Sequence, residues 1–199
     1  MSIKLFLLGR PGSGKSTAAK YIEEYAKAQG WKTASFKDHG ILYQLFQKDV
    51  EQKRFLPEGD GFFVKDTSAF TEALELLEVD IISYIPTSQP NEVITIEFAR
   101  ENYVQVVQQL SQELVEDAYF LCIDTRIDVC IQRVYERATL PNGPDNHFVS
   151  KRALQKHYQK QHFPTKKEVK NIWVVANHGS WDEFVNKIDP VLNEILKQK

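Results

Sequence analysis

The chain has 199 residues, of which 42% are hydrophobic, and this is enough for one compact α/β domain over residues 1–199. Its formal net charge of −2 excludes the strongly basic character of a protein that binds nucleic acid nonspecifically. Cys122 and Cys130 are too few for a disulfide framework or a structural zinc site, and no segment has the length of a membrane span or the pattern of a signal peptide. These features predict a cytoplasmic protein with no membrane partner.

The first predicted element is a short apolar strand, residues 3–8, and a glycine-rich segment follows it at once. This segment, Gly9-Arg10-Pro11-Gly12-Ser13-Gly14-Lys15-Ser16, matches the P-loop pattern G-x-x-x-x-G-K-[ST], and residues 16–28 predict the helix that should come next. Its glycines allow backbone N–H groups to turn inward around a phosphate, and the start of the helix adds a favourable dipole. Lys15 is placed to pair the β- and γ-phosphates, and the Ser16 hydroxyl to ligate Mg²⁺.

The P-loop context favours a site for ATP or GTP over a glycine-rich turn without a ligand, because strand, loop and helix agree. The residues expected to contact the nucleotide here are Gly9, Pro11, Gly12, Ser13, Gly14, Lys15, Ser16 and Thr17.

Four further short apolar segments predict strands, at residues 33–36, 93–96, 120–123 and 172–175. Helical stretches separate them, which is typical of a parallel sheet with helices on both faces. We therefore expect an α/β, three-layer P-loop NTPase fold with a five-stranded parallel sheet and a short lid.

Apolar residues at helical spacing predict helices over residues 70–84, ended by Pro86, over residues 103–114, and over residues 127–138. Ser180 and Glu183 form a capping box for a last helix. Residues 52–66 do not fit the alternation and are interpreted as a long loop, because they contain two glycines and a proline.

The P-loop and the order of the elements resemble the nucleoside and nucleotide kinases of the P-loop class, of which adenylate kinase is the familiar member. The Asn-Lys-x-Asp run that reads guanine in GTPases is absent. The Asp-Gly-Phe-Pro-Arg run of adenylate kinase is absent too, which argues against AMP as the acceptor.

The resemblance implies roles for charged residues at the ends of two strands. Glu97 would lie near Mg²⁺ or accept a proton from the attacking hydroxyl, and Arg100 would hold an anionic acceptor. Asp38 would be the general base of the transfer, or it would cap the helix that follows it, and the sequence is compatible with both interpretations. His39 would contact the acceptor. A surface salt bridge is the alternative for Glu97 and Arg100.

The resemblance also implies a lid over residues 137–165. Arg133 and Arg137 lie one helical turn apart, at and just before its start, and a turn rich in proline and glycine follows them. Lid arginines neutralise the charge of the transferring phosphoryl group, and Arg133 would contact the nucleotide as well. The alternative is a solvated helix face. Asn177 and Gly179, after the last strand, correspond to the loop that contacts adenine or to an ordinary turn.

The acceptor region is expected over residues 39–85, with Phe63 and Arg152 as further contacts. Residues 151–170 are rich in lysine, which by default indicates a solvated surface and otherwise an oligonucleotide partner. We expect an ATP- and Mg²⁺-dependent kinase with a small-molecule acceptor, a nucleoside or nucleotide. A polynucleotide or RNA-end kinase and a non-catalytic ATP-binding switch are the alternatives.

Overall fold

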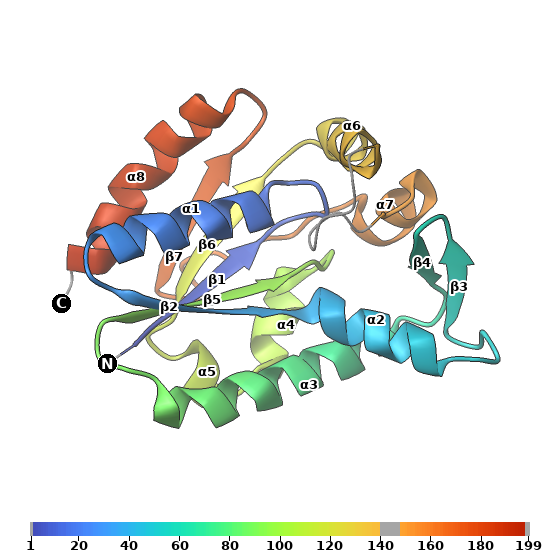
Figure 1. The fold of residues 1–199 in the computed structure, drawn as a ribbon, viewed down its shortest axis with the longest axis horizontal. Helices are drawn as coiled ribbons and strands as arrows, with labels where there is room; N and C mark the ends of the chain where they lie inside the picture. Colours follow the sequence, from blue (N-terminus) through green and yellow to red (C-terminus); the bar gives the residue numbers. More distant parts are fainter. Residues whose placement is uncertain (1, 140–147, 198–199) are drawn as a thin grey trace.

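A five-stranded parallel sheet forms the centre of the molecule, and its strand order is β2-β5-β1-β6-β7 (Figure 1). The computed structural model describes residues 2–139 and 148–197. The strands are β1 (Ile3–Leu8), β2 (Lys32–Lys37), β5 (Glu92–Phe98), β6 (Tyr119–Asp124) and β7 (Asn171–Ala176). All four pairings are parallel, and each strand contains the segment predicted for it. The α/β three-layer expectation is thereby confirmed.

Helices cover both faces of the sheet, which explains why its inner strands read as continuous apolar runs. One face carries α1 (Lys15–Ala28) and α8 (Trp181–Lys197), and the other α3 (Ser68–Tyr84), α4 (Tyr103–Gln109) and α5 (Gln112–Val115) (Figure 1). Successive side chains of β1 alternate between the two cores: Ile3, Leu5 and Leu7 pack on the side of α1 and α8, whereas Phe6 and Leu8 pack with α3 and α4.

The ends of two helices follow the sequence signals. The Ser180 hydroxyl accepts a hydrogen bond from the Glu183 N–H at 3.3 Å, as the capping box predicts for α8. Helix α3 ends at Tyr84, and Pro86 lies in the 3₁₀ turn η1 (Ile85–Thr87) that follows.

The single helix expected over residues 103–114 is divided in the structure into α4 and α5. Leu110 has an extended backbone with ψ of 148°, and the Ser111 N–H donates to the carboxylate of Glu78 on α3 at 2.7 Å. This tertiary hydrogen bond replaces a helical one, so the expectation of one continuous helix is wrong although its apolar stripe is buried.

Residues 52–66 form a β-hairpin instead of the long loop that we expected. Strands β3 (Phe55–Glu58) and β4 (Gly61–Val64) pair antiparallel around a turn at Gly59, where φ is +57°. The hairpin is stable because Phe55 and Val64 are buried against α2 (Asp38–Lys48) and α3. Glycine and proline correctly indicated the turn, but their presence also led us to predict a loop where the two short strands lie.

Two helices lie beyond the carboxyl ends of the strands, α6 (Ile127–Ala138) and α7 (Lys151–Tyr158), and α7 is the one next to the hairpin (Figure 1). Helix α7 lies within the region expected to form the lid, whereas only the last two residues of α6 do. Of the expected turn between them, residues 140–147 lie outside the described residues. Among the described residues, no helix has the length and apolar character needed to cross a membrane.

Candidate active site

The P-loop connects β1 to α1 in a backbone conformation that requires glycine. Gly12 and Gly14 have φ of +80° and +100°, a region that side chains disfavour. A Cβ on Gly12 would lie 2.5 Å from the carbonyl oxygen of Cys130, and one on Gly14 would lie 2.6 Å from Nδ2 of Asn177. These two glycines therefore allow the P-loop to pack directly against α6 (Ile127–Ala138) and against Asn177, which follows β7.

Buried side chains hold the P-loop from behind. The Tyr103 hydroxyl, which is fully buried, accepts from the Gly9 N–H at 2.8 Å and donates to the Gly9 carbonyl at 2.9 Å. Thr125 Oγ1 and Asn177 Nδ2 both donate to the Ser13 carbonyl, at 3.2 and 2.8 Å. Gly9 and Ser13, expected to contact the nucleotide, thus make these supporting contacts and do not line the cavity described below.

Sequence reasoning assigned Tyr103 only to an apolar stripe and passed over Thr125. A hydroxyl within an apolar stripe needs a buried hydrogen-bond partner, and this was the signal that could have found Tyr103. Burial raises the pKa of Tyr103, so the hydroxyl stays protonated and can both donate and accept.

Lys15 is the cation of the P-loop. Its Nζ donates to the carbonyls of Gly9 and Arg10, at 2.8 and 2.9 Å. Burial lowers the pKa of Lys15, while the nearby carboxylates of Glu97 and Asp38 act in the opposite direction. The ammonium is therefore held over the P-loop by two neutral acceptors, which an anionic phosphate would replace.

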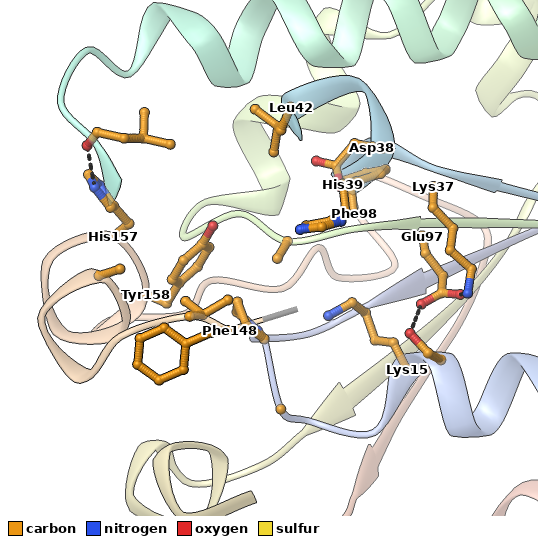
Figure 2. A pocket seen from close by; sticks show the side chains of 18 of the residues that line it. Lys15, Lys37, Asp38, His39, Leu42, Glu97, Phe98, Phe148, His157 and Tyr158 are labelled. Atoms are coloured by element: carbon orange, nitrogen blue, oxygen red, sulfur yellow. Dashed lines mark hydrogen bonds and ion pairs between the residues drawn. The ribbon is translucent and has the colours of Figure 1, made fainter. Parts of the chain in front are cut away.

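A hydroxyl and a carboxylate meet at the start of α1, as the magnesium prediction requires. Ser16 Oγ donates to Glu97 Oε2 at 2.9 Å, and Lys37 Nζ lies 3.2 Å from Glu97 Oε1 (Figure 2). The pairing of β2 with β5 places Lys37 directly beside Glu97, a neighbour that sequence reasoning missed. Oxygen ligands of this kind fit Mg²⁺, which completes its shell with water and substrate phosphates. No cluster of three metal-ligating His, Cys, Asp or Glu residues occurs in the described part of the chain.

Asp38 forms a buried ion pair and does not cap α2. The helix begins at Asp38 itself, after the extended residue Lys37, and no side chain caps it. The carboxylate accepts from Arg100 Nη1 at 2.5 Å, and both residues are less than 10% exposed. The capping interpretation is therefore wrong, because the side chain turns away from the helix N-terminus toward Arg100.

Arg100 was expected to hold an acceptor, but its guanidinium forms hydrogen bonds with Asp38 and with two backbone carbonyls. Nη1 also donates to the Ala99 carbonyl and Nη2 to the Phe70 carbonyl, both at 2.7 Å. Its guanidinium lies 5.0 Å from the ring centroid of Phe70. Arg100 does not line the cavity, so the structure places it as a support of Asp38 and not as an acceptor contact.

Arg133 and Arg137 face the P-loop from α6. Arg133 Nη1 donates to the Asn177 carbonyl at 3.3 Å and Nη2 to the Gly179 carbonyl at 3.4 Å. Both arginines line the same cavity as Lys15. The expected proximity of the two lid arginines, the P-loop and the loop after β7 is thus present in the structure.

Arg10, a variable position of the motif, joins the P-loop to the end of α7. Nε donates to the Tyr158 carbonyl at 2.8 Å, and Nη1 donates to the Thr125 carbonyl at 2.9 Å and to Gln161 Oε1 at 2.8 Å. These contacts fix the carboxyl end of α7, and with it Tyr158, relative to the phosphate cradle.

One cavity of about 450 Å³ lies between the P-loop and the helices α2, α6 and α7 (Figure 2). Its P-loop side is lined by Pro11, Gly12, Gly14, Lys15, Ser16, Thr17, Lys37, Glu97, Arg133 and Arg137. Its other side is lined by Asp38, His39, Gly40, Leu42, Phe62, Val64, Phe70, Phe98, Ala99, Phe148, Val149, Ala153, His157 and Tyr158. Figure 2 shows Lys15 reaching into the space that His39 and Tyr158 face from the opposite side.

Two expected acceptor contacts, Phe63 and Arg152, lie outside this cavity. The Arg152 guanidinium lies 4.2 Å above the ring of Phe63, which is 6% exposed. Phe62, the next residue on β4, lines the cavity instead, because successive side chains of a strand point to opposite faces.

No protein-family model matches this chain, and no curated protein matches it. Solved structures do match over nearly the whole length. A sugar kinase from a Janibacter species is 16% identical, with 98% of this chain and 96% of that chain covered and a TM-score of 0.61. A gluconokinase from Sinorhizobium meliloti is 15% identical, with 98% and 94% covered and a TM-score of 0.60. The APS kinase of Mycobacterium tuberculosis, in complex with AMPPNP and APS, is 15% identical, with 96% and 98% covered and a TM-score of 0.60. The chain therefore has the fold of the P-loop kinases.

Proposed function

We propose that this chain is an ATP- and Mg²⁺-dependent kinase that transfers the γ-phosphoryl group to a hydroxyl of a small acceptor. One observation carries the proposal: a single cavity is lined on one side by the P-loop and on the other by an apolar compartment, with Asp38 on the compartment side and Lys15 opposite. A nucleotide switch needs the first side only. The resemblance in sequence favours a nucleoside or nucleotide as the acceptor.

The donor side would bind ATP through the backbone of the P-loop. Lys15 would exchange the carbonyls of Gly9 and Arg10 for phosphate oxygens, and Arg133 and Arg137 would meet the charge of the transferring group. Ser16 and Glu97 would hold Mg²⁺, which supplies charge neutralisation at the phosphates. The AMPPNP complex of the structurally similar APS kinase supports ATP as the donor.

Asp38 would act as the general base of the transfer. The acceptor oxygen attacks the γ-phosphorus, the bond to the leaving ADP oxygen breaks, and the hydroxyl proton passes to Asp38. Arg100 keeps the carboxylate in one orientation, because its three hydrogen bonds to Asp38, Ala99 and Phe70 leave it little freedom. The ion pair is thus a device for positioning the base.

The test is a transfer assay with Mg²⁺, γ-labelled ATP and a pool of nucleosides, nucleotides, sugars and RNA 5′-hydroxyl ends. We expect label on one small acceptor, loss of transfer in Lys15→Ala, and normal transfer in Lys20→Ala, which removes an exposed lysine of the same helix. Asp38→Asn should slow transfer to a hydroxyl by about 100-fold. Release of label only as phosphate, or ATP binding without transfer, would refute the kinase proposal and favour the switch.

An RNA-end kinase is the second candidate, because α7 presents a basic outer face. Lys151, Arg152 and Lys156 are exposed on this helix, whose other face carries Ala153 and His157 into the cavity. Label on an RNA 5′-hydroxyl end that is lost in Lys156→Ala would establish this alternative.

A further inference from the structure

We infer that the acceptor is an uncharged alcohol that carries a planar ring, with the ring in the aromatic half of the cavity and the hydroxyl beside Asp38. The inference rests on the proposed kinase function and narrows its acceptor from nucleosides or nucleotides to neutral compounds. Two observations carry it: where the cations of the cavity lie, and how the aromatic side chains opposite them are held.

The cations of the cavity belong to the phosphate end. Lys15, Arg133 and Arg137 come from the P-loop and α6, and Lys37 lies 3.2 Å from the carboxylate of Glu97. Among the described residues that line the acceptor half, from α2, the hairpin, α3 and α7, there is no lysine or arginine. Residues 140–147, between α6 and Phe148, contain no lysine or arginine in sequence either. A phosphate or carboxylate on the acceptor would therefore find no permanent cation in this half.

The two imidazoles of the acceptor half do not replace such a cation. His157 Nε2 lies 2.9 Å from the Val64 carbonyl, and burial lowers the pKa of His157, so the ring is neutral at pH 7 and donates this hydrogen bond. His39 faces the cavity next to Asp38 in the chain, and any anion that approached His39 would also meet that carboxylate (Figure 2). Arg100, on the far side of Asp38, already donates to Asp38 and two carbonyls.

The aromatic side chains of this half are held in place before any ligand binds. The ring of Phe62 stacks on Phe46 at 5.3 Å, meets Phe55 edge-on at 5.3 Å, and lies 6.0 Å from His39 with an interplanar angle of 17°. Phe148 packs against Tyr135 at 5.5 Å. An aromatic lining that is already fixed in place favours a flat apolar ring, because its side chains lose little freedom when the ligand binds.

Besides the two imidazoles, the ionisable side chains among the described residues of this half are Asp38 and Tyr158, and both could bind a hydroxyl. Asp38 and Tyr158 face the cavity, and burial raises the pKa of Tyr158, which keeps the phenol neutral and able to hydrogen-bond. The volume of about 450 Å³ is shared with the phosphates of the donor, so the acceptor is a compact molecule of nucleoside size.

The deciding experiment is calorimetric titration of the protein in the presence of Mg²⁺ and a non-hydrolysable ATP analogue. The probes are four nucleosides, their 5′-monophosphates, two phenyl-substituted alcohols, shikimate and gluconate. We expect an uncharged ring compound to bind at least about ten-fold more tightly than its monophosphate and than the two acids. Transfer of label is measured on the same compounds.

Matched variants separate stacking from overall folding. Phe62→Ala should weaken binding of the ring compound by about ten-fold or more, and Phe62→Leu, which keeps an apolar side chain in the hairpin, by a similar factor. Trp181→Ala, at an exposed aromatic of α8 that does not line the cavity, should leave binding unchanged.

The outcomes test the inference about the acceptor and the proposed kinase activity separately. Transfer to a monophosphate or to an acid, with binding as tight as that of the neutral compound, would overturn the inference and leave the kinase intact. Binding of the neutral compound without transfer would support the inference about the pocket and refute the kinase. Absence of binding by every neutral ring compound, or equal binding in Phe62→Leu, would overturn the inference.

Discussion

Replacing Arg100 by methionine removes the cation of the buried pair and keeps an apolar stem of similar length. The carboxylate of Asp38 then loses its partner at 2.5 Å, and the carbonyls of Ala99 and Phe70 lose their donors. Removing one partner of a buried pair costs about 3–5 kcal/mol of unfolding free energy. For a domain of this size we expect the Tm to fall by about 6–20 °C, at roughly 2–4 °C for each kcal/mol.

The assay is urea unfolding of five proteins: wild type, Arg100→Met, Asp38→Asn, the double variant and a control variant. Asp38→Asn should cost about 1–2 kcal/mol, because the amide oxygen still accepts from the guanidinium while the charge is lost. The double variant should be more stable than the sum of the single losses by about 1–3 kcal/mol, since the stranded charge is then absent. Arg152→Met, which removes an exposed guanidinium over Phe63, is the control and should cost about 0.5–1 kcal/mol.

A loss below about 1 kcal/mol in Arg100→Met would refute the assignment of this pair, because even one stranded buried carboxylate costs more. Strict additivity in the double variant would refute it as well. Either result would mean that Asp38 and Arg100 are hydrated separately, and Arg100 could no longer be the group that positions the base.

Three further predictions concern the lid, the metal and the pH dependence. Arg137→Ala should lower kcat by about 100-fold while ATP affinity changes by less than about three-fold, because a lid arginine acts on the transition state; a loss confined to ATP affinity in steady-state kinetics and titration would contradict this. Glu97→Gln should raise the Mg²⁺ concentration for half-maximal activity by about ten-fold or more, whereas Glu92→Gln at the other end of β5 should not; equal effects would remove Glu97 from the metal site. Burial lowers the pKa of His157 in the folded protein, so the unfolded chain protonates this ring first as the pH falls. The stability that the neutral ring contributes is present above the ordinary pKa of about 6.5 and is lost as the pH falls through the lower folded pKa. Urea unfolding at pH 7.5, 6.5 and 5.5 should show a smaller loss in His157→Gln than in wild type, and an equal or larger loss would exclude the effect.

The sheet and the phosphate cradle were predictable because their signals are local. Each strand lies within one or two residues of its predicted apolar segment, and the P-loop pattern identified the glycines whose Cβ atoms would collide with the protein. The hairpin over residues 55–64 was missed, because its strands are four residues long and carry proline or glycine. Such short strands are stable only through their packing on α2 and α3, and no local pattern reports that.

The acceptor side of the cavity was also predictable only in part. The resemblance placed Asp38 and His39 at the acceptor and Arg133 and Arg137 at the transferring phosphoryl group, and the structure brings all four to one cavity. Which of the adjacent residues Phe62 and Phe63 faces that cavity depends on how the hairpin is turned. Because Phe62 and Phe63 are both apolar, the sequence does not show which face of the hairpin points into the cavity.

The positions of the strands and of the phosphate cradle could be predicted from the chain, because backbone freedom at glycine and apolar periodicity are properties of neighbouring residues. The support of Asp38 by Arg100 and of Gly9 by Tyr103 is visible only in the folded molecule. These partners are 62 and 94 positions apart, and they meet because the parallel order β2-β5-β1 brings the ends of three strands together. A guanidinium or a hydroxyl buried at such a junction forms hydrogen bonds with the groups that the fold brings near it, and no local sequence pattern predicts which groups these are.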